Sequence, residues 1–500
     1  MTPTPLYDDN AAAYKARAQF ESHLGAELVR SLAGNPSRLA MVDRSGPKRR
    51  PIRSGTLLAI ASLLAEEFKK IPERRVGIVL PPGVGGSLAN CALTLVDKIP
   101  VNLNFTAGKA AIESCIEQSG IKTIISADIM KEKLPEFPWS GAFVDIGTLV
   151  KNFGKRRILS RIALVHLSSP ERLIKKWNVP TQGGDREASL LFTSGSSGEP
   201  KGVPLSHRNI LGNIQQIVEF KLFIEGESAL GCLPLFHSFG FTVTLWLPLI
   251  GQFLVITTPS PFDLSRNIQA IREENINILI GAPTFLRPYI KRAEPHSIPS
   301  VRCVVSGAEK TPAGFGELWE SHFGNHYLEG YGLTETTPVM GVNLPPRDGL
   351  VFGQWNRRGS IGRLLPGQAI RIVDPDTGED LGYDQQGLLH VKGVNVFNGY
   401  LDNPKETAEV LKDGWLNTGD LARLDKDHFL YIDGRLSRFS KIGGEKVPHG
   451  TIESAILKVL GMKEGDTEKP LFVVAGRRDK VKGESLVLLS TIDIDMHHLR

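Results

Sequence analysis

The segment LLFTSGSSGEPKGVPLSHRNI, residues 190–210, combines residue types that are suited to holding a phosphate group. It contains three glycines, five hydroxyl side chains and one lysine, Lys201, near its middle. Glycines let several backbone N–H groups point into one concavity, and such a concavity favours an anion. The hydroxyl donors beside these glycines belong to Thr193, Ser194, Ser196 and Ser197. The alternative, a flexible Ser/Gly-rich linker, is not expected to follow directly from an apolar strand.

The elements around this segment are predicted to be a strand that ends at Ser194 and a helix that begins near Ser206. Such a strand–loop–helix unit would add the dipole of the helix N-terminus to the anion site. The glycine and lysine spacing matches neither the GxxxxGK[ST] loop nor the GxGxxG dinucleotide turn. The segment is therefore predicted to bind phosphate outside both of these classes.

The rest of the first 340 residues alternates short apolar runs with helical patterns. Predicted buried strands lie at 75–82, 121–127, 189–194, 253–258, 276–283 and 301–309. Predicted helices lie at 55–70, 107–120, 264–274 and 313–323. This alternation predicts an α/β fold with parallel sheets. After Thr337, short strands broken by Gly, Pro and Asp predict a small β-barrel-like subdomain of antiparallel strands.

These changes in sequence pattern predict a large N-terminal domain and a small C-terminal domain. Residues 1–434 form the N-terminal domain, with α/β subdomains at about 1–180 and 181–340 and a β subdomain at 341–434. Residues 435–500 form part of a small α+β C-terminal domain. A chain of 500 residues is too long for a single core, which agrees with this division.

Composition and charge exclude some classes of protein. The net charge of +5 is too small to indicate nucleic-acid binding. Basic clusters at 47–53, 154–157 and 172–176 are either solvated faces or docking surfaces for an acidic partner or anionic lipid. The uncharged run at 238–261 is interrupted by Pro248 and Gly251, so it predicts a buried helix and strand instead of a membrane span.

Cysteine usage and the N-terminus indicate a cytoplasmic protein. The four cysteines have no CxxC spacing and are predicted to be reduced, buried thiols. The first 20 residues contain acidic side chains and no apolar core, so they are not a signal peptide. An association with the inner face of the membrane is compatible with the basic clusters.

The phosphate-binding segment is the first of several motifs that follow in a fixed order. They are FTSGSSGEPKGVPLSHRN (192–209), LPLFHSFG (233–240), SGAE (306–309), YGLTETTP (331–338), GWLNTGDLARLDKDHFLYIDGR (414–435) and SKIGGEKV (440–447). This set resembles the adenylate-forming superfamily of acyl-CoA synthetases, peptide-synthetase adenylation domains and firefly luciferase. Residues 99–127, VFNGYLDNP (396–404) and FSKIGGEKVPHGTIE (439–453) are most similar to acyl–acyl carrier protein synthetase. That activity often forms the ligase half of an enzyme with a lysophospholipid acyltransferase.

The resemblance implies an ATP-dependent, AMP-forming acid–thiol ligase. A fatty acid would be converted to acyl-AMP with the help of Mg²⁺, and then passed to a phosphopantetheine thiol. Acyl carrier protein is favoured over CoA as the acceptor, and peripheral membrane contact is compatible with a fatty-acid substrate. The alternatives are a ligase for another carboxylic acid and a non-catalytic module that binds ATP or a fatty acid.

The same resemblance assigns residues to the phosphates and the metal. Lys201 and the loop would hold the β- and γ-phosphates, the loop residues being Thr193, Ser194, Gly195, Ser196, Ser197 and Gly198. Thr334 would bond a phosphate oxygen, and Glu335 would hold magnesium, which prefers carboxylate and phosphate oxygens. The alternative for Glu335 is a carboxylate at the start of a helix.

Other motif residues would bind the nucleoside. The adenine is assigned to Gly307, Ala308, Glu309, Tyr331 and Gly332. Asp420 would accept hydrogen bonds from both ribose hydroxyls, and Arg435 would meet the ribose or the α-phosphate. The alternative for Asp420 is an Asx turn between strands.

The sequence leaves two alternatives open for the residues expected to bind the substrate acid. His237 either orients the substrate carboxylate or is a satisfied core or surface histidine. The apolar side chains of Phe239, Phe241 and Trp246 suit an acyl-chain pocket and suit core packing equally.

Two features depart from the family pattern. The usual hinge position, which carries Asp or Lys in relatives, is Ser437 here. The adenylation lysine of relatives follows a glycine late in the C-terminal domain, and no matching pair occurs in the 59 residues after Lys441. Lys480 and Lys482 do not match it either. We therefore expect a truncated chain or a variant impaired in the first half-reaction.

Overall fold

The computed structural model describes residues 5–139, 141–194, 199–346, 355–442, 445–462, 471–479 and 483–494. The chain divides into two compact units. The larger unit comprises Tyr7–Ile370 and Val391–Leu416, and the smaller unit comprises Met1–Leu6, Arg371–His390 and Asn417–Arg500. Three strands, β17 (Gln368–Val373), β18 (Gly387–Gly393) and β20 (Trp415–Leu424), contain residues of both units.

One sheet of the larger unit contains the phosphate-binding segment. Its strand order is β7 (Ala142–Asp145), β6 (Thr123–Ser126), β4 (Arg75–Ile78), β5 (Ile99–Asn102), β8 (Glu187–Ser194) and β9 (Pro200–Ser206). All pairs are parallel except β8 with β9, which is antiparallel. The strands predicted at 75–82, 121–127 and 189–194 are confirmed as β4, β6 and β8.

A second sheet of the same unit has a parallel centre and antiparallel edges. Its order is β16 (Arg363–Leu364), β15 (Val339–Val342), β14 (His326–Gly332), β13 (Cys303–Ser306), β12 (Ile278–Gly281), β10 (Ser228–Gly231), β11 (Leu254–Thr257), β2 (Leu39–Asp43) and β3 (Arg50–Arg53). Pairs from β14 through β2 are parallel, whereas β15, β16 and β3 pair antiparallel. The predicted strands at 253–258, 276–283 and 301–309 are confirmed as β11, β12 and β13.

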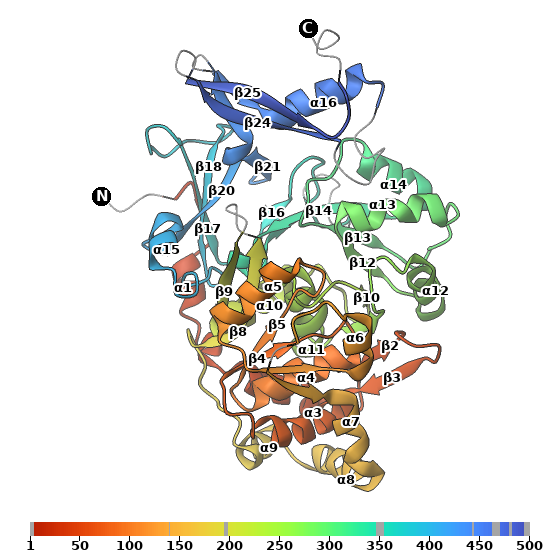
Figure 1. Cartoon of the computed structure of the whole chain (residues 1–500). Coiled ribbons are helices and arrows are strands. Elements are labelled where there is room, and N and C mark those ends of the chain that lie inside the picture. Colours follow the sequence, from red (N-terminus) through yellow and green to blue (C-terminus); the bar gives the residue numbers. More distant parts are fainter. Residues whose placement is uncertain are drawn as a thin grey trace. The chain divides into compact units, whose positions relative to one another are not determined.

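Helices connect and cover these strands (Figure 1). Those from the first part of the unit are α1 (Ala11–Lys15), α2 (Leu24–Gly34), α3 (Ser54–Phe68), α4 (Val84–Leu95), α5 (Lys109–Ser119), α6 (Asp128–Lys133), α7 (Ile146–Asn152), α8 (Gly154–Leu167) and α9 (Pro170–Trp177). Those that follow are α10 (His207–Glu219), α11 (Leu247–Ile250), α12 (Leu264–Glu274), α13 (Pro283–Arg292), α14 (Phe315–Phe323) and α15 (Pro404–Val410). The helices predicted at 55–70, 107–120, 264–274 and 313–323 are confirmed as α3, α5, α12 and α14. The predicted α/β class with parallel sheets is therefore correct.

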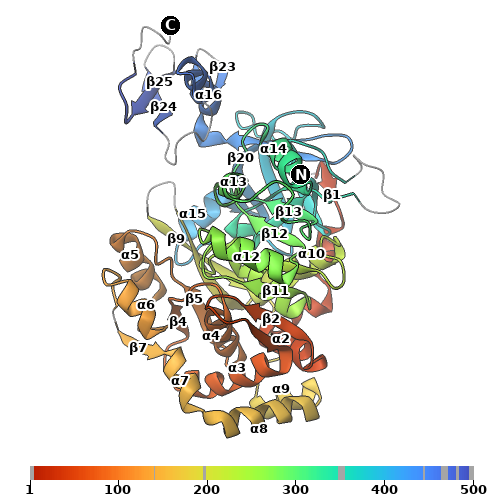
Figure 2. The same ribbon diagram turned by 90° about the vertical axis from the view of Figure 1, so that its right-hand side faces the viewer.

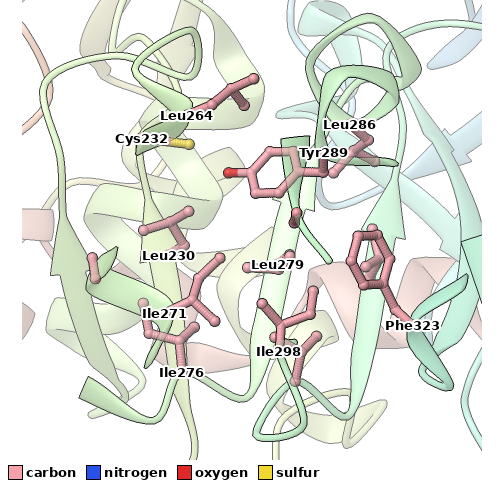
Figure 3. Packing of buried hydrophobic residues seen from close by; sticks show 14 of the residues in the cluster. Leu230, Cys232, Leu264, Ile271, Ile276, Leu279, Leu286, Tyr289, Ile298 and Phe323 are labelled. Atoms are coloured by element: carbon pink, nitrogen blue, oxygen red, sulfur yellow. The ribbon is translucent and has the colours of Figure 1, made fainter. Parts of the chain in front are cut away.

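The core beneath the second sheet joins strands to the helices that connect them (Figure 3). Leu230 of β10 and Leu279 of β12 point toward Ile271 of α12, and Tyr289 of α13 and Phe323 of α14 close the same cluster. These side chains are at most 3% exposed. Burial of one such side chain stabilises a fold by roughly 1.5–3 kcal/mol, so this cluster fixes the strand ends that carry the predicted site.

Most of the uncharged run at 238–261 is buried in this unit. It forms a π-helical segment (Gly240–Trp246), the short helix α11 and strand β11. No helix within the described residues is both long and apolar enough to cross a membrane. All four cysteines are buried free thiols, as predicted.

The described part of the smaller unit contains antiparallel strands and an amphipathic helix. Strand β21 (Leu430–Arg435) pairs antiparallel with β20, and Val373, Leu388 and Leu421 form a small core cluster. A second sheet has the order β23 (Glu445–Pro448), β22 (Phe439–Ile442), β25 (Gly483–Ser490) and β24 (Phe472–Asp479). Helix α16 (His449–Val459) lies beside β24 (Figure 2), and its Ile456 forms a cluster with Phe472 and Val474.

Candidate active site

The phosphate-binding segment forms an antiparallel hairpin of β8 and β9. Ser194 pairs with Pro200 beside the loop, and Glu187 pairs with Ser206 at the opposite end. The predicted strand–loop–helix unit is therefore wrong, because β9 intervenes and α10 begins only at His207. The N-terminus of α10 lies at the Glu187 end of the hairpin, and its dipole acts only within about one turn. This helix therefore cannot contribute to the anion site as expected.

The hairpin places two of the predicted phosphate-binding residues opposite each other. Thr193 of β8 pairs with Lys201 of β9, and Ser194 ends β8. The other predicted members, Gly195, Ser196, Ser197 and Gly198, lie outside the described residues. Lys201 therefore stands at the base of the glycine-rich loop.

Lys201 is held by two residues that follow strand β18. Its ammonium group forms an ion pair with the carboxylate of Glu406 on α15, and it lies 5.4 Å from the centroid of the Tyr400 ring. Glu406 is fixed in turn by Asn403, whose Nδ2 donates a 2.7 Å hydrogen bond to Oε2 of Glu406. The Lys201 side chain is only 19% exposed, so its charge is positioned before any ligand binds.

Tyr400 connects this lysine to the predicted magnesium ligand. The Tyr400 hydroxyl donates a 2.8 Å hydrogen bond to Oε1 of Glu335. The Phe397 N–H donates to the backbone oxygen of Glu335 at 2.9 Å, which fixes the peptide as well. Sequence reasoning missed Tyr400 as a site residue, although its motif, VFNGYLDNP, contributed to the family resemblance.

Glu335 lies in a short 3₁₀ turn, Thr334–Thr336. Oε2 of Glu335 makes no hydrogen bond within the described part of the chain, while Oε1 accepts from Tyr400. A half-buried carboxylate with one oxygen held and one available fits a magnesium ion, which is usually bound by one or two carboxylates plus phosphate oxygens. Beside it, Oγ1 of Thr334 lies 3.2 Å from Oγ of Ser238. The structure thus brings the LPLFHSFG and YGLTETTP motifs together.

The predicted adenine residues occupy two neighbouring strand ends. Gly332 ends β14, and a Cβ added to it would lie 1.8 Å from the backbone oxygen of Pro338. Only glycine can occupy this position without moving the chain. Half-buried Tyr331 precedes it.

Gly307, Ala308 and Glu309 follow the carboxyl end of β13, which is the edge where ligands bind in parallel sheets. Ala308 has a φ of +69°, in the left-handed region that residues other than glycine seldom adopt. Oε2 of Glu309 accepts a 2.6 Å hydrogen bond from Oγ1 of Thr284, so this carboxylate is held in place.

His237 is exposed to solvent, but nearby protein atoms displace part of the water that would otherwise surround its ring. These surroundings lower the pKa of the imidazole below its usual value, and the negative charge of Glu309 partly opposes this. Nδ1 of His237 accepts a 3.3 Å hydrogen bond from the Phe239 N–H, so a neutral ring carries its proton on Nε2. A neutral imidazole with an Nε2 proton can donate a hydrogen bond to a carboxylate.

The apolar residues near His237 divide between the two predicted alternatives. Phe241 and Trp246 are fully buried and their ring centroids lie 6.1 Å apart, which is core packing. Phe239 is only half-buried and lies beside Gly307, 3.6 Å from the position of an added Cβ. Of the three side chains, Phe239 alone is placed to meet a ligand.

The predicted ribose residues belong to the smaller unit. Asp420 of β20 pairs across the strands with Arg435 of β21, and Nε of Arg435 lies 3.1 Å from Oδ1 of Asp420. The Asp420 side chain is 5% exposed, while that of Arg435 is 58% exposed. Asp420 lies in strand β20, between Gly419, whose φ is +74°, and a break in strand register after Leu421, so the pairing with Arg435 favours a strand position over an Asx turn.

A cluster that sequence reasoning did not single out contains His23, Asp97 and His207, whose ligand-type atoms lie within 4.8 Å of one another. Nδ1 of His23 accepts from the Gly25 N–H at 3.0 Å, and Nδ1 of His207 accepts from the Leu24 N–H at 3.1 Å. Both neutral rings therefore carry a proton on Nε2, the atom that would have to bind a metal. The cluster fits a structural role that joins α2 to α10.

Comparison with known proteins identifies the family to which the chain is similar. The model of a family described as AMP-binding enzyme matches residues 55–401. The chain is 32% identical over 303 residues to a long-chain-fatty-acid–CoA ligase of Bacillus subtilis, which covers 60% of this chain and 51% of that protein. It is also 32% identical over 317 residues to a probable 4-coumarate–CoA ligase of Dictyostelium discoideum, covering 60% and 56%. The chain thus spans about half the length of the curated relatives it matches.

Solved structures share the fold at lower identity. O-succinylbenzoate coenzyme A synthetase from Bacillus subtilis, in complex with ATP and magnesium ion, superposes with a TM-score of 0.76 at 22% identity, covering 95% of this chain and 90% of that chain. ATP-bound MatB from Rhodopseudomonas palustris gives a TM-score of 0.74 at 24% identity, covering 95% and 92%. These similarities establish the α/β fold with a small C-terminal domain.

Proposed function

Because the chain belongs to the AMP-binding enzyme family, we propose that it is an ATP-dependent acid–thiol ligase that forms AMP. The acid is a fatty acid, and the acceptor is a phosphopantetheine thiol, with acyl carrier protein favoured over CoA. The resemblance of residues 99–127, 396–404 and 439–453 to acyl–acyl carrier protein synthetase supports these finer assignments.

The observation that carries the proposal is the contact network of Lys201, Tyr400 and Glu335. The ammonium group of Lys201 lies 5.4 Å from the centroid of the Tyr400 ring, and the Tyr400 hydroxyl donates a 2.8 Å hydrogen bond to Oε1 of Glu335. A fixed cation beside a carboxylate with one available oxygen is what a metal-bound polyphosphate requires. Neither core packing nor a linker explains why three polar groups from distant segments converge here.

The proposed reaction has two steps whose atoms balance. An oxygen of the substrate carboxylate bonds to the α-phosphorus of ATP, and the bond from that phosphorus to the pyrophosphate oxygen breaks. The acceptor sulfur then bonds to the acyl carbon, its proton leaves, and AMP departs. Magnesium, when bound, neutralises phosphate charge. Lys201 stabilises the negative charge of the leaving pyrophosphate, and His237 donates a hydrogen bond from Nε2 to the substrate carboxylate.

The remaining predicted residues are proposed to bind the nucleotide. Thr334 and the loop from Thr193 to Gly198 donate to phosphate oxygens. Gly307, Ala308, Glu309, Tyr331 and Gly332 form the adenine wall. Asp420 accepts hydrogen bonds from the ribose hydroxyls, and Arg435 meets the ribose or the α-phosphate. Residues 435–500 are proposed to act as part of a mobile domain that changes position between the two steps.

The test of the first step is ATP–pyrophosphate exchange dependent on fatty acids of different chain length. Lys201→Ala and Glu335→Gln should each lower the exchange rate by about 100-fold, because each removes charge that is positioned at the phosphates. Lys412→Ala, which removes an exposed lysine on the short strand β19 (Leu411–Lys412), is the matched control and should leave the rate unchanged. Exchange that survives both active-site changes would contradict the proposed roles.

The second step is tested by comparing acceptors. The chain is given preformed acyl-AMP with either phosphopantetheinylated acyl carrier protein or CoA. Faster thioester formation on the carrier protein supports the proposed acceptor. Faster formation on CoA would assign the chain to the acyl-CoA ligases instead.

A further inference from the structure

Helix α8 carries a row of four exposed side chains, three of them apolar, that no part of the described chain covers. Lys155, Leu159, Ala163 and Leu167 follow one another at intervals of four residues, and all four are exposed. Leu159 is 63% exposed and Leu167 is 83% exposed, whereas Val165 on the opposite side is fully buried. Side chains four residues apart lie on one face of a helix, so these positions form a single outward stripe.

The helix is firmly anchored through its other face. Arg157 and Arg161 both form ion pairs with Glu66 of α3, and Nη1 of Arg161 donates a 2.9 Å hydrogen bond to Oγ of Ser62 on the same helix. These contacts fix the rotation of α8 about its own axis. The exposure of Leu159 and Leu167 is therefore a property of the folded unit and does not result from a loosely held helix.

Positive charge surrounds the stripe. Residues 151–177 contain eight lysines or arginines and a single acidic residue, Glu171, which gives a formal charge of +7 in a chain whose total is +5. Glu171 pairs with Arg30 of α2. Among the described residues, the exposed cations Lys155, Arg156, Lys175 and Lys176 have no carboxylate within ion-pair distance. The rest of the chain is slightly negative, so attraction to an anionic surface is concentrated in this segment.

Helices α8 and α9 lie together at one end of the larger unit, whereas α13 and α14 lie at the other end in both views (Figures 1 and 2). They pack on α3 and α2. Neither helix contributes a residue to the described contacts of Lys201, Tyr400 and Glu335. The stripe is therefore separate from the residues assigned to catalysis.

From these observations we propose that the outer face of α8, with the cations of α8 and α9, binds the surface of an anionic lipid bilayer. A helix with exposed leucines beside lysine and arginine is suited to the boundary between headgroups and acyl chains, where the leucines leave water and the cations meet lipid phosphates. At about 21 Å, α8 is long enough to lie along that boundary. The surface would retain the protein where amphipathic molecules are concentrated.

The proposal is tested by co-sedimentation of the whole chain with vesicles of phosphatidylcholine alone or of phosphatidylcholine with phosphatidylglycerol. Binding to the phosphatidylglycerol vesicles at low salt, lost at high salt, is expected. Two double variants, Leu159→Gln/Leu167→Gln and Lys155→Glu/Arg156→Glu, test the two parts of this surface. Each should bind the phosphatidylglycerol vesicles at least about tenfold more weakly than the unaltered chain does. Leu318→Gln on α14 and Lys412→Glu on β19 change an exposed leucine and an exposed lysine elsewhere, and they should bind as the unaltered chain does.

A variant that is expected to bind vesicles more tightly gives a result that loss of folding cannot produce. Ala163→Leu extends the apolar stripe at an exposed position and should strengthen vesicle binding several-fold. Failure of the unaltered chain to sediment with phosphatidylglycerol vesicles, or unchanged binding by both double variants, would overturn the proposal. It would also be overturned if those variants kept vesicle binding but lost binding to an acidic acyl carrier protein. Sedimentation requires no turnover, so its outcome is independent of the proposed ligase activity.

Discussion

The hydroxyl of Tyr400 donates a 2.8 Å hydrogen bond to Oε1 of Glu335, and the ring of the same tyrosine lies against the ammonium group of Lys201. Tyr400 therefore acts as a positioning residue between a carboxylate and a cation that are proposed to hold opposite sides of a metal–phosphate group. Its backbone N–H is fixed by a 2.9 Å hydrogen bond to Oγ1 of Thr407.

Tyr400→Phe should lower ATP–pyrophosphate exchange by about tenfold, because removal of a hydrogen bond that orients a metal ligand typically costs 10–100-fold. The apparent KM for magnesium should rise more than the KM for the acid, since only the carboxylate loses its partner. Tyr383→Phe, which removes a hydroxyl that contacts the Leu6 carbonyl and His428, is the matched control. Equal changes in both KM values would indicate a general structural effect instead.

Asp420→Asn should raise the KM for ATP by at least tenfold and leave the KM for the acid nearly unchanged. The carboxylate is buried and held 3.1 Å from Nε of Arg435, so the neutral amide removes both an acceptor and a charge partner. Steady-state exchange at varied ATP measures the effect. Asp433→Asn, on the same strand as Arg435, is the control, and a similar loss there would show that β21 is simply sensitive to substitution.

Gly332→Ala should abolish exchange and lower the thermal midpoint by several degrees. The added methyl group would lie 1.8 Å from the Pro338 oxygen, so the end of β14, which carries Tyr331, and the following turn, which carries Thr334, would have to move. Gly34→Ala provides the comparison, because nothing lies within 4 Å of its added Cβ and alanine favours the end of α2. An active, equally stable Gly332→Ala protein would contradict this account.

His207 should make the fold sensitive to acid. Burial, together with the neighbouring His23, lowers the pKa of the His207 imidazole to about 2, while the unfolded chain titrates near pH 6.5. The unfolded state thus binds one more proton below that pH, so the free energy of unfolding should fall as pH decreases, by about 1.4 kcal/mol per unit below pH 6. Asp97, whose pKa is lowered, adds to this loss only at more acidic pH.

Denaturant unfolding at pH 5, 6, 7 and 8 measures this dependence. His207→Gln should be less stable at pH 8, because the Leu24 N–H loses its ring acceptor, and should show a smaller loss between pH 6.5 and 5. His166→Gln changes an exposed histidine on α8 and should retain the full pH dependence. Identical pH slopes for His207→Gln and the unaltered chain would exclude His207 as the source.

Strand β9 shows where local sequence patterns become unreliable. The segment PKGVPLS contains two prolines and a glycine, which usually indicate a loop, and it was expected to lead directly into a helix. It nevertheless pairs with β8 along its whole length as the edge strand of the sheet. Proline is tolerated at an edge, where one side of the strand needs no donor. Only the order of the strands shows that β9 is such an edge.

The sequence by itself determined the parallel strands, the helices between them and the types of residue available for phosphate chemistry. Runs such as 189–194 and 301–309 are predictable because burial on both faces leaves a continuous apolar pattern within a few residues. The tertiary structure decided which segments meet: Tyr400 between Lys201 and Glu335, the helix N-terminus far from the glycine-rich loop, and the leucines of α8 left uncovered. Backbone preference and hydrophobic period act over single elements, whereas these contacts depend on strand order and on the rotation of each helix.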